Sequence, residues 1–171
     1  GKPTKKYPFI GNFAFEQAVA LADSGTDVTF FGIDLRSFRR KRPYGISYGV
    51  AGKVRWYVIS IPIGAVPLSL LCFIGAKALS YLYSKVYKNR KKPDIVHAHF
   101  TEIGQMAASL VKKIDVPLVI TEHSSAMNCE NVNESLQKCA LKGYKMAARV
   151  VAVSHPLSQN IKRYTGIDAI V

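Results

Sequence analysis

The sequence contains little cysteine and little negative charge. It has three cysteines among 171 residues, and Cys72, Cys129 and Cys139 form neither an even set nor a C-x-x-C pair. This pattern indicates neither a disulfide framework nor a cysteine zinc site, and a reduced cytoplasmic location fits it best. Acidic residues number 11 against 24 basic ones, giving a formal net charge of +13. Such an excess attracts polyanions, so nucleic acid and an anionic membrane surface are the first partners to consider.

Motifs of several familiar binding sites are also missing. The chain has no G-x-G-x-x-G or G-x-x-x-x-G-K-[ST] phosphate loop and no H-E-x-x-H metal helix. A serine hydrolase could use Ser124, Ser125 or Ser154, but no orienting acid can be assigned to any of them. No nucleic-acid module or aromatic stacking platform is recognisable, so nucleic acid is not expected as a partner. Phosphate binding would depend on Gly11, in a loop that opens a helix.

The positive charge is concentrated in two segments, residues 36–42 (RSFRRKR) and 85–92 (KVYKNRKK). A solvated face explains such clusters as well as a polyanion site does. Between them, residues 56–76 carry no charge over a length that could cross a bilayer. Prolines and a glycine interrupt this stretch and basic residues flank both sides, so we do not expect a spanning helix. We expect a buried strand followed by an amphipathic helix that packs in the core or lies in a membrane interface.

Helical and strand periodicities alternate along the chain. Helices are predicted over residues 12–25, 68–89, 103–113, 132–148 and 156–164. Strands are predicted over residues 27–33, 56–61, 94–100, 117–123 and 149–154, with another beginning at 168. This order predicts one doubly wound α/β domain with a mostly parallel sheet and helices on both faces.

Histidines occur where the predicted strands end, in HAHF, TEHS and VSH. The carboxyl ends of parallel strands share one edge of a sheet, where ligands bind, so these polar groups should converge. His97 and His99 lie two residues apart on one strand face, and His123 could complete a site of three histidines. We do not favour a metal site, because both faces of the sheet should be covered by helices and no supporting motif occurs.

Four segments of the chain are informative when they are taken together and in order. They are YPFIGNFAFEQAVALADSGTDVTFF, PDIVHAHF, PLVITEHS and ARVVAVSHPLSQNIKRYTG. Together they resemble the N-terminal domain of the family 4 retaining glycosyltransferases, and they cover most of the chain except residues 36–92. The resemblance implies the two-domain GT-B architecture, with residues 1–171 as its Rossmann-like, acceptor-side domain. The donor-binding C-terminal domain, with its E-x7-E pair, is absent from this chain. We therefore expect a piece of a longer protein that is nearly inactive alone.

The resemblance assigns a catalytic residue and a donor side. His123, of the T-x-H motif, would lie next to the transferred sugar and is the expected catalytic residue. The loop that contains Gly11 and Asn12 would approach the donor diphosphate, with the Gly11 amide facing it. Ser154 would line the cleft beneath the donor.

Other residues would belong to the acceptor side or to its support. His99 and Thr101 follow the strand that borders the acceptor, and Glu122 and Ser124 flank the expected catalytic histidine. We expect these four residues to bind substrate. His97 lies deeper in its strand, and we expect it to pack in the core.

The resemblance further implies a reaction. The full enzyme would be a glycosyltransferase of the hexosyltransferase type that transfers a sugar from a nucleotide diphosphosugar to an acceptor hydroxyl with retention. It would use no cofactor besides its donor substrate, and its main task would be to stabilise developing charge. The basic segments and the apolar helix suggest an anionic membrane with a lipid-linked acceptor, in bacterial polysaccharide biosynthesis. The enzyme would then be peripheral on the inner face of the plasma membrane.

Two other functions remain open at this point. A sugar-nucleotide epimerase of GT-B shape also carries histidines at its strand ends, and it would turn over nucleotide sugar without an acceptor. A non-enzymatic, membrane-associated binding module would have no second domain. The coding sequence beyond Val171 separates these alternatives from a transferase.

Overall fold

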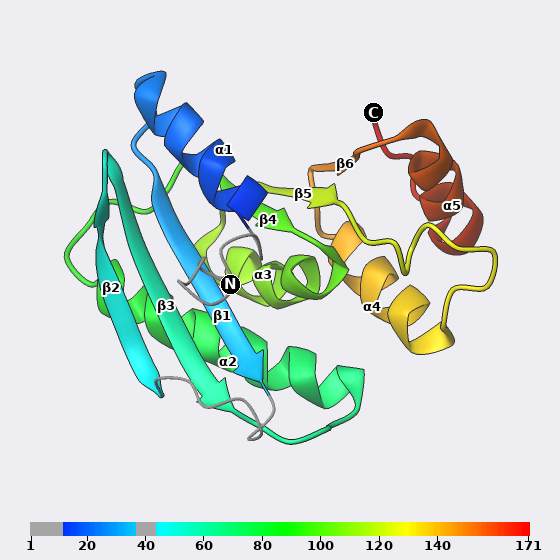
Figure 1. The fold of residues 1–171 in the computed structure, drawn as a ribbon, viewed down its shortest axis with the longest axis horizontal. Helices are drawn as coiled ribbons and strands as arrows, with labels where there is room; N and C mark the ends of the chain where they lie inside the picture. The colour runs from blue at the N-terminus through cyan, green and yellow to red at the C-terminus, as the bar shows by residue number, and fades with distance from the viewer. Residues whose placement is uncertain (1–11, 37–43) are drawn as a thin grey trace. The chain divides into compact units, whose positions relative to one another are not determined.

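The computed structural model describes residues 12–36 and 44–171, and strands and helices alternate in it from residue 54 onward (Figure 1). The predicted α/β class is confirmed, since the parallel strands β4, β5 and β6 are connected through helices and the first sheet also contains a parallel pair. The structure divides between Val66 and Pro67 into two compact units, and each has its own three-stranded sheet. The loop residue Gly11 and most of the first basic segment lie outside the described residues.

The first unit is a sheet with one helix. Its elements are α1 (Asn12–Asp23), β1 (Thr29–Arg36), β2 (Gly45–Ala51) and β3 (Val54–Pro62). β3 is central, parallel to β1 and antiparallel to β2 (Figure 1). Strand β2 was not predicted from the sequence, and most of its side chains are exposed, so it lacks the apolar pattern of a core strand.

Helix α1 packs through a narrow stripe of small and aromatic residues. Ala18 and Ala22, four positions apart on one helix face, are buried together with Val54 of β3. The Phe15 ring meets Phe30 of β1 edge to face, with 5.2 Å between ring centroids. The helix predicted over residues 12–25 is thus present, although it ends at Asp23.

The second unit contains a parallel sheet with the order β4-β5-β6. Its strands are β4 (Val96–His99), β5 (Leu118–Glu122) and β6 (Arg149–Ala152), and its helices are α2 (Leu68–Val86), α3 (Thr101–Ile114), α4 (Glu134–Tyr144) and α5 (His155–Thr165). Each was predicted to within a few residues. The strand predicted from residue 168 is reduced to Ile170, which bridges Val151 in parallel.

Helix α3 is the centre of this unit, because it packs against β4 and β5 and against α2 and α4. Glycines allow these close approaches. A Cβ on Gly143 of α4 would lie 2.9 Å from the backbone nitrogen of Gln105, and one on Gly104 would lie 2.7 Å from Ile120 Cδ1. The buried thiols of Cys72 and Cys139 bring α2 and α4 together, with 3.7 Å between the sulfurs. Side chains on the helix-facing side of the sheet are buried: Ala98, Leu118, Ile120, Val150 and Ala152.

The parallel order aligns the carboxyl ends of β4, β5 and β6 along one edge. Backbone hydrogen bonds hold the segments that leave these strands together: Phe100 N donates to Thr121 O at 2.9 Å, and Val153 N donates to Glu122 O at 3.4 Å. The residues predicted to line a site in HAHF, TEHS and VSH therefore lie at or just beyond the carboxyl ends of three adjacent strands.

Helix α2 is the longest helix of the described chain at 19 residues, and its exposed side carries Lys77 and Lys85. Among the described helices, none combines the length and the apolar character required to span a bilayer.

Candidate functional site

The turn from β4 into α3 places the first part of the site. Phe100 has φ 73° and ψ 153°, in a region that non-glycine residues rarely occupy, and Thr101 then begins α3. The Phe100 carbonyl accepts a hydrogen bond from Gly104 N at 2.9 Å, so the strained residue connects strand and helix directly. Its ring lies 5.4 Å from the ring of His123. Backbone strain of this kind, costing about 1–3 kcal/mol, is common at functional sites.

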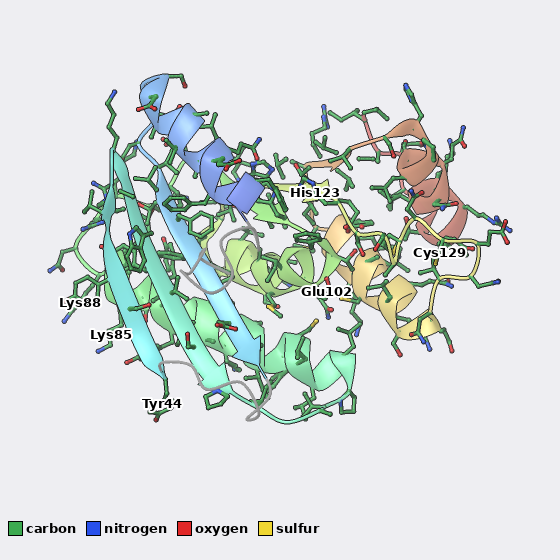
Figure 2. The ribbon with its side chains drawn as sticks, viewed as in Figure 1. Tyr44, Lys85, Lys88, Glu102, His123 and Cys129 are labelled. Carbon is green, nitrogen blue, oxygen red and sulfur yellow. The ribbon has the colours of Figure 1, made fainter. Side chains whose placement is uncertain are left out.

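Three histidines gather at this edge of the sheet. Figure 2 labels one of them, His123. The ring centroids of His97 and His99 are 4.5 Å apart, and those of His99 and His123 are 5.3 Å apart. His99 Nδ1 and His123 Nε2 lie at hydrogen-bond distance, 3.1 Å. The predicted convergence of HAHF and TEHS is therefore present, because His99 of β4 pairs with Thr121 of β5 in the sheet register.

The expectation that His97 packs in the core is wrong. Its side chain is exposed, and Nε2 lies 2.7 Å from Thr121 Oγ1. The reason is the face on which it lies: Ala98, which points to the opposite face toward the helices, is 3% exposed. His97 therefore shares the more open face with His99, which is half-buried.

Burial keeps the paired imidazoles neutral at pH 7. Burial, together with the smaller effects of the neighbouring His97 and His123, lowers the pKa of His99 to about 4. Burial also lowers the pKa of His123, although the negative charge of Glu122 partly opposes this effect. In a pair of neutral rings one nitrogen donates its hydrogen and the other accepts, so His99 and His123 share a single proton between Nδ1 and Nε2.

Glu122 lies behind His123, on the helix-facing side of the sheet, and is fully buried. Its Oε1 accepts hydrogen bonds from the backbone nitrogens of His123 (2.9 Å) and Ser124 (2.7 Å). Its Oε2 accepts from the hydroxyls of Tyr144 (2.7 Å) and Thr101. Thr101 is also fully buried, so neither Thr101 nor Glu122 presents a side chain at the surface where a substrate would arrive.

Tyr144 was not singled out from the sequence, although it completes this buried cluster. It is the last residue of α4 and 2% exposed, and its oxygen lies 3.0 Å from Thr101 Oγ1. Burial, and secondarily the charge of Glu122, raise the pKa of Tyr144 well above its usual value, so it remains a hydrogen-bond donor. A tyrosine on the apolar face of an amphipathic helix carries no sequence signal beyond core packing.

The two predicted serines lie at neighbouring strand ends. Ser124 is half-buried, and its Oγ accepts from Ala126 N at 3.1 Å, which shapes the turn after β5. Ser154 is the N-cap of α5, where its Oγ accepts from Leu157 N at 3.4 Å. Both serines therefore stabilise local backbone at the edge where the histidines lie.

The remaining predicted site residues belong to the first unit. Gly11 lies outside the described residues, and Asn12 is described only as the first residue of α1. The same unit contains a G-x-S-x-G match, Gly45 to Gly49, that sequence reasoning passed over. A nucleophilic serine in that motif requires a sharp turn from strand to helix, but Ser47 lies within the antiparallel strand β2. The match therefore indicates no hydrolase.

The described residues around the histidines form no metal centre, and a hollow in the same unit lies elsewhere. Within residues 12–36 and 44–171, no group of three or more His, Cys, Asp or Glu side chains is arranged to hold a metal ion. A hollow of about 330 Å³ lies beside the start of β6, where Arg149 and Asp168 line it. That is the amino end of the strand, whereas ligands of such sheets bind at the carboxyl ends.

Comparison with known proteins identifies the family. The sequence model described as Glycosyltransferase Family 4 matches residues 10–171. The chain therefore belongs to glycosyltransferase family 4, as its motifs suggested. TuaC of Bacillus subtilis (strain 168), a glycosyltransferase assigned to teichuronic acid biosynthesis, is 30% identical to it over 188 residues. The match covers 99% of this chain and 46% of TuaC, so the chain spans about half the length of this relative.

The neutral histidine pair predicts an acid-shifted titration. The chain contains four histidines, so their ring signals can be followed singly by NMR between pH 3 and 9 and assigned with His99→Gln. We expect His99 to titrate near pH 4 and His123 below 6.5. Because the unfolded state takes up these protons first, the free energy of unfolding should fall as the pH drops from about 6.5 toward 4. A pKa of 6.5 or above for His99 would show that the pair is not buried as described.

Proposed function

We propose that the full-length protein is a retaining glycosyltransferase of the hexosyltransferase type. It transfers a sugar from a nucleotide diphosphosugar to a saccharide acceptor, and this chain supplies the acceptor-side domain. Membership of glycosyltransferase family 4 supports the reaction class. The assigned role of TuaC supports an acceptor within a bacterial polysaccharide pathway. The donor needs no separate cofactor, because the nucleotide diphosphate is itself the leaving group.

The position of His123 carries this proposal. It follows the last residue of a parallel strand, at the sheet edge where ligands bind, and it is only half-buried. Its ring is oriented by His99, and its backbone is fixed by Glu122. A neutral imidazole held in this way can hydrogen-bond a sugar hydroxyl without introducing a positive charge beside the oxocarbenium-like centre.

The other predicted residues fall into two groups in this proposal. His99 and Ser124 lie beside His123 and contact the acceptor or the transferred sugar. Thr101 and Glu122 are buried, so they support the site from behind instead of touching substrate.

The donor side depends on the helix starts. Gly11 and Asn12 precede and begin α1, and Ser154 caps α5. Backbone N–H groups and the helix dipole favour a diphosphate at such positions. In this proposal, the remaining donor contacts come from a donor-binding C-terminal domain of the full-length enzyme. That domain is needed for turnover, so each activity measurement below uses the full-length protein.

A surface of α2 suits an anionic membrane. One side of α2 carries an aromatic or lysine side chain at every fourth position, and all of these side chains are exposed: Phe73, Lys77, Tyr81 and Lys85. We call these residues the aromatic–lysine stripe. Lys77 Nζ lies 5.5 Å from the Phe73 ring centroid and Lys85 Nζ 5.6 Å from that of Tyr81, so each cation sits beside an apolar ring.

The end of α2 extends this positive surface. Lys85 and Lys88 point away from the ribbon there (Figure 2). Aromatic rings bordered by lysines suit the boundary between lipid headgroups and acyl chains, and the net charge of +13 favours an anionic surface. We therefore place the full-length enzyme in the cytoplasm, peripheral on the inner face of the plasma membrane, where a lipid-linked acceptor would be reached.

Replacing His123 by Ala in the full-length enzyme tests the central assignment. We expect kcat to fall roughly 100- to 1,000-fold, as on losing a hydrogen bond made to developing charge. Turnover should be measured with a panel of nucleotide sugars, with and without acceptor, by detection of the released nucleotide. A suitable control is Gln159→Ala, because Gln159 is an exposed side chain within α5 that lies away from the helix start.

Equal turnover of His123→Ala and wild type would contradict the assignment. Conversion of a nucleotide sugar without any acceptor would instead support an epimerase.

Liposome flotation tests the membrane surface. We expect the chain to float with phosphatidylcholine vesicles containing phosphatidylglycerol, to float less with phosphatidylcholine alone, and to bind less as salt rises. Lys77→Glu/Lys85→Glu should reduce binding strongly. Lys112→Glu/Lys113→Glu changes the net charge equally at exposed positions of α3 and should bind almost like wild type. Absence of binding to both vesicles, or equal losses in the two double variants, would exclude the stripe as the membrane surface.

A further inference from the structure

The carboxylate of Glu122 joins three parts of the second unit at one point. Thr101 is the first residue of α3 and Tyr144 is the last residue of α4, and both hydroxyls donate to Oε2. The backbone nitrogens of His123 and Ser124 donate to Oε1. All four donors thus converge on a side chain that is 0% exposed. The sequence indicated Thr101 and Glu122 as substrate-binding residues, but neither their burial nor the contribution of Tyr144 was predicted.

A buried carboxylate is an unfavourable choice if only packing is needed. Removing its charge from water is unfavourable until hydrogen bonds compensate, and an apolar side chain of similar volume often stabilises a core equally well. An apolar side chain, however, cannot accept hydrogen bonds from the two backbone N–H groups that follow the end of β5. The ladder with β6 stops at Glu122, which pairs with Ala152, so His123 and Ser124 lie beyond the strand.

The contacts also fix the direction of His123. Its backbone nitrogen is bound from the helix-facing side by Glu122, while its ring nitrogen Nε2 meets His99 on the open face. Because both the backbone nitrogen and the ring of His123 are held by hydrogen bonds, its side chain has little rotational freedom. The charge of Glu122 additionally raises the pKa of His123 relative to what burial alone would give.

We propose that Glu122 is a positioning residue for His123, and that Thr101 and Tyr144 hold its carboxylate in place for this purpose. The proposal rests on the role of His123 given above. It goes beyond that role by assigning a function to a buried carboxylate and to two hydroxyls that touch no substrate. Replacing any of these three residues should therefore affect turnover only when His123 is present.

Glu122→Gln is the decisive variant, because it keeps the side-chain volume and an oxygen acceptor but removes the charge. In the full-length enzyme we expect kcat to fall roughly 10- to 100-fold, the effect of misplacing a catalytic group, while KM for the donor changes little. In the His123→Ala background the same change should produce no further loss, because residues that act as a unit are not additive. Glu102→Gln is the matched control, an acid on the first turn of α3 (Figure 2).

A readout on this chain does not require activity. Glu122→Gln should lower the pKa of His123, measured from its ring NMR signals, because a negative charge that favours the imidazolium is lost. Glu102→Gln should leave that pKa unchanged. Tyr144→Phe serves as a second variant should Glu122→Gln fail to fold, since it retains the carboxylate and both backbone bonds while removing one donor to Oε2. It should lower kcat by a smaller factor, again only when His123 is present.

The outcomes separate the two proposals. If His123→Ala lowers turnover but Glu122→Gln and Tyr144→Phe do not, or if their losses add to that of His123→Ala, the positioning role is overturned and the function of His123 stands. If Glu122→Gln shifts the titration of His123 while His123→Ala retains full activity, the proposed function fails and the physical coupling between the two residues remains.

Discussion

The buried carboxylate of Glu122 is the interaction on which the rest of the site depends. An ionised group without exposure would destabilise the fold by several kcal/mol if its partners were lost. Here two hydroxyls and two backbone N–H groups satisfy its oxygens. The start of α3, the end of α4 and the turn after β5 must therefore meet at the carboxylate. Their hydrogen bonds to Glu122 hold these three segments in place.

The open face of the same strands follows from this arrangement. Side chains alternate along β4 and β5, so the residues that face α3 are buried while His97 and His99 face the other way. The register pairs His99 with Thr121, and the turn held by Glu122 brings His123 within 3.1 Å of His99. The buried Glu122 cluster on one face of the sheet and the neutral histidine pair on the other face are therefore connected through the backbone of the same strand and turn. Through this connection the buried Glu122 can influence the position of His123 on the open face.

Sequence periodicity predicted most elements, because alternating strands and helices leave strong patterns, and parallel strand ends predicted that His99 and His123 would converge. The patterns failed where tertiary context decides. Strand β2 has few buried side chains and left no signal. His97 was assigned to the core because it lies deeper in its strand than His99, but its face of the sheet is the more open one. The partnership of Glu122 with Tyr144 joins residues 22 positions apart through a helix end, which no spacing rule anticipates.

Amide hydrogen exchange measured by NMR on this chain tests the central claim most directly. If the Glu122 carboxylate binds the turn, the amides of His123 and Ser124 should exchange about as slowly as those within β5, although both residues lie beyond the strand. The exposed Ser125 provides the fast-exchanging comparison in the same turn. Exchange of His123 and Ser124 at the rate of Ser125 would contradict the claim that the buried carboxylate holds this site together.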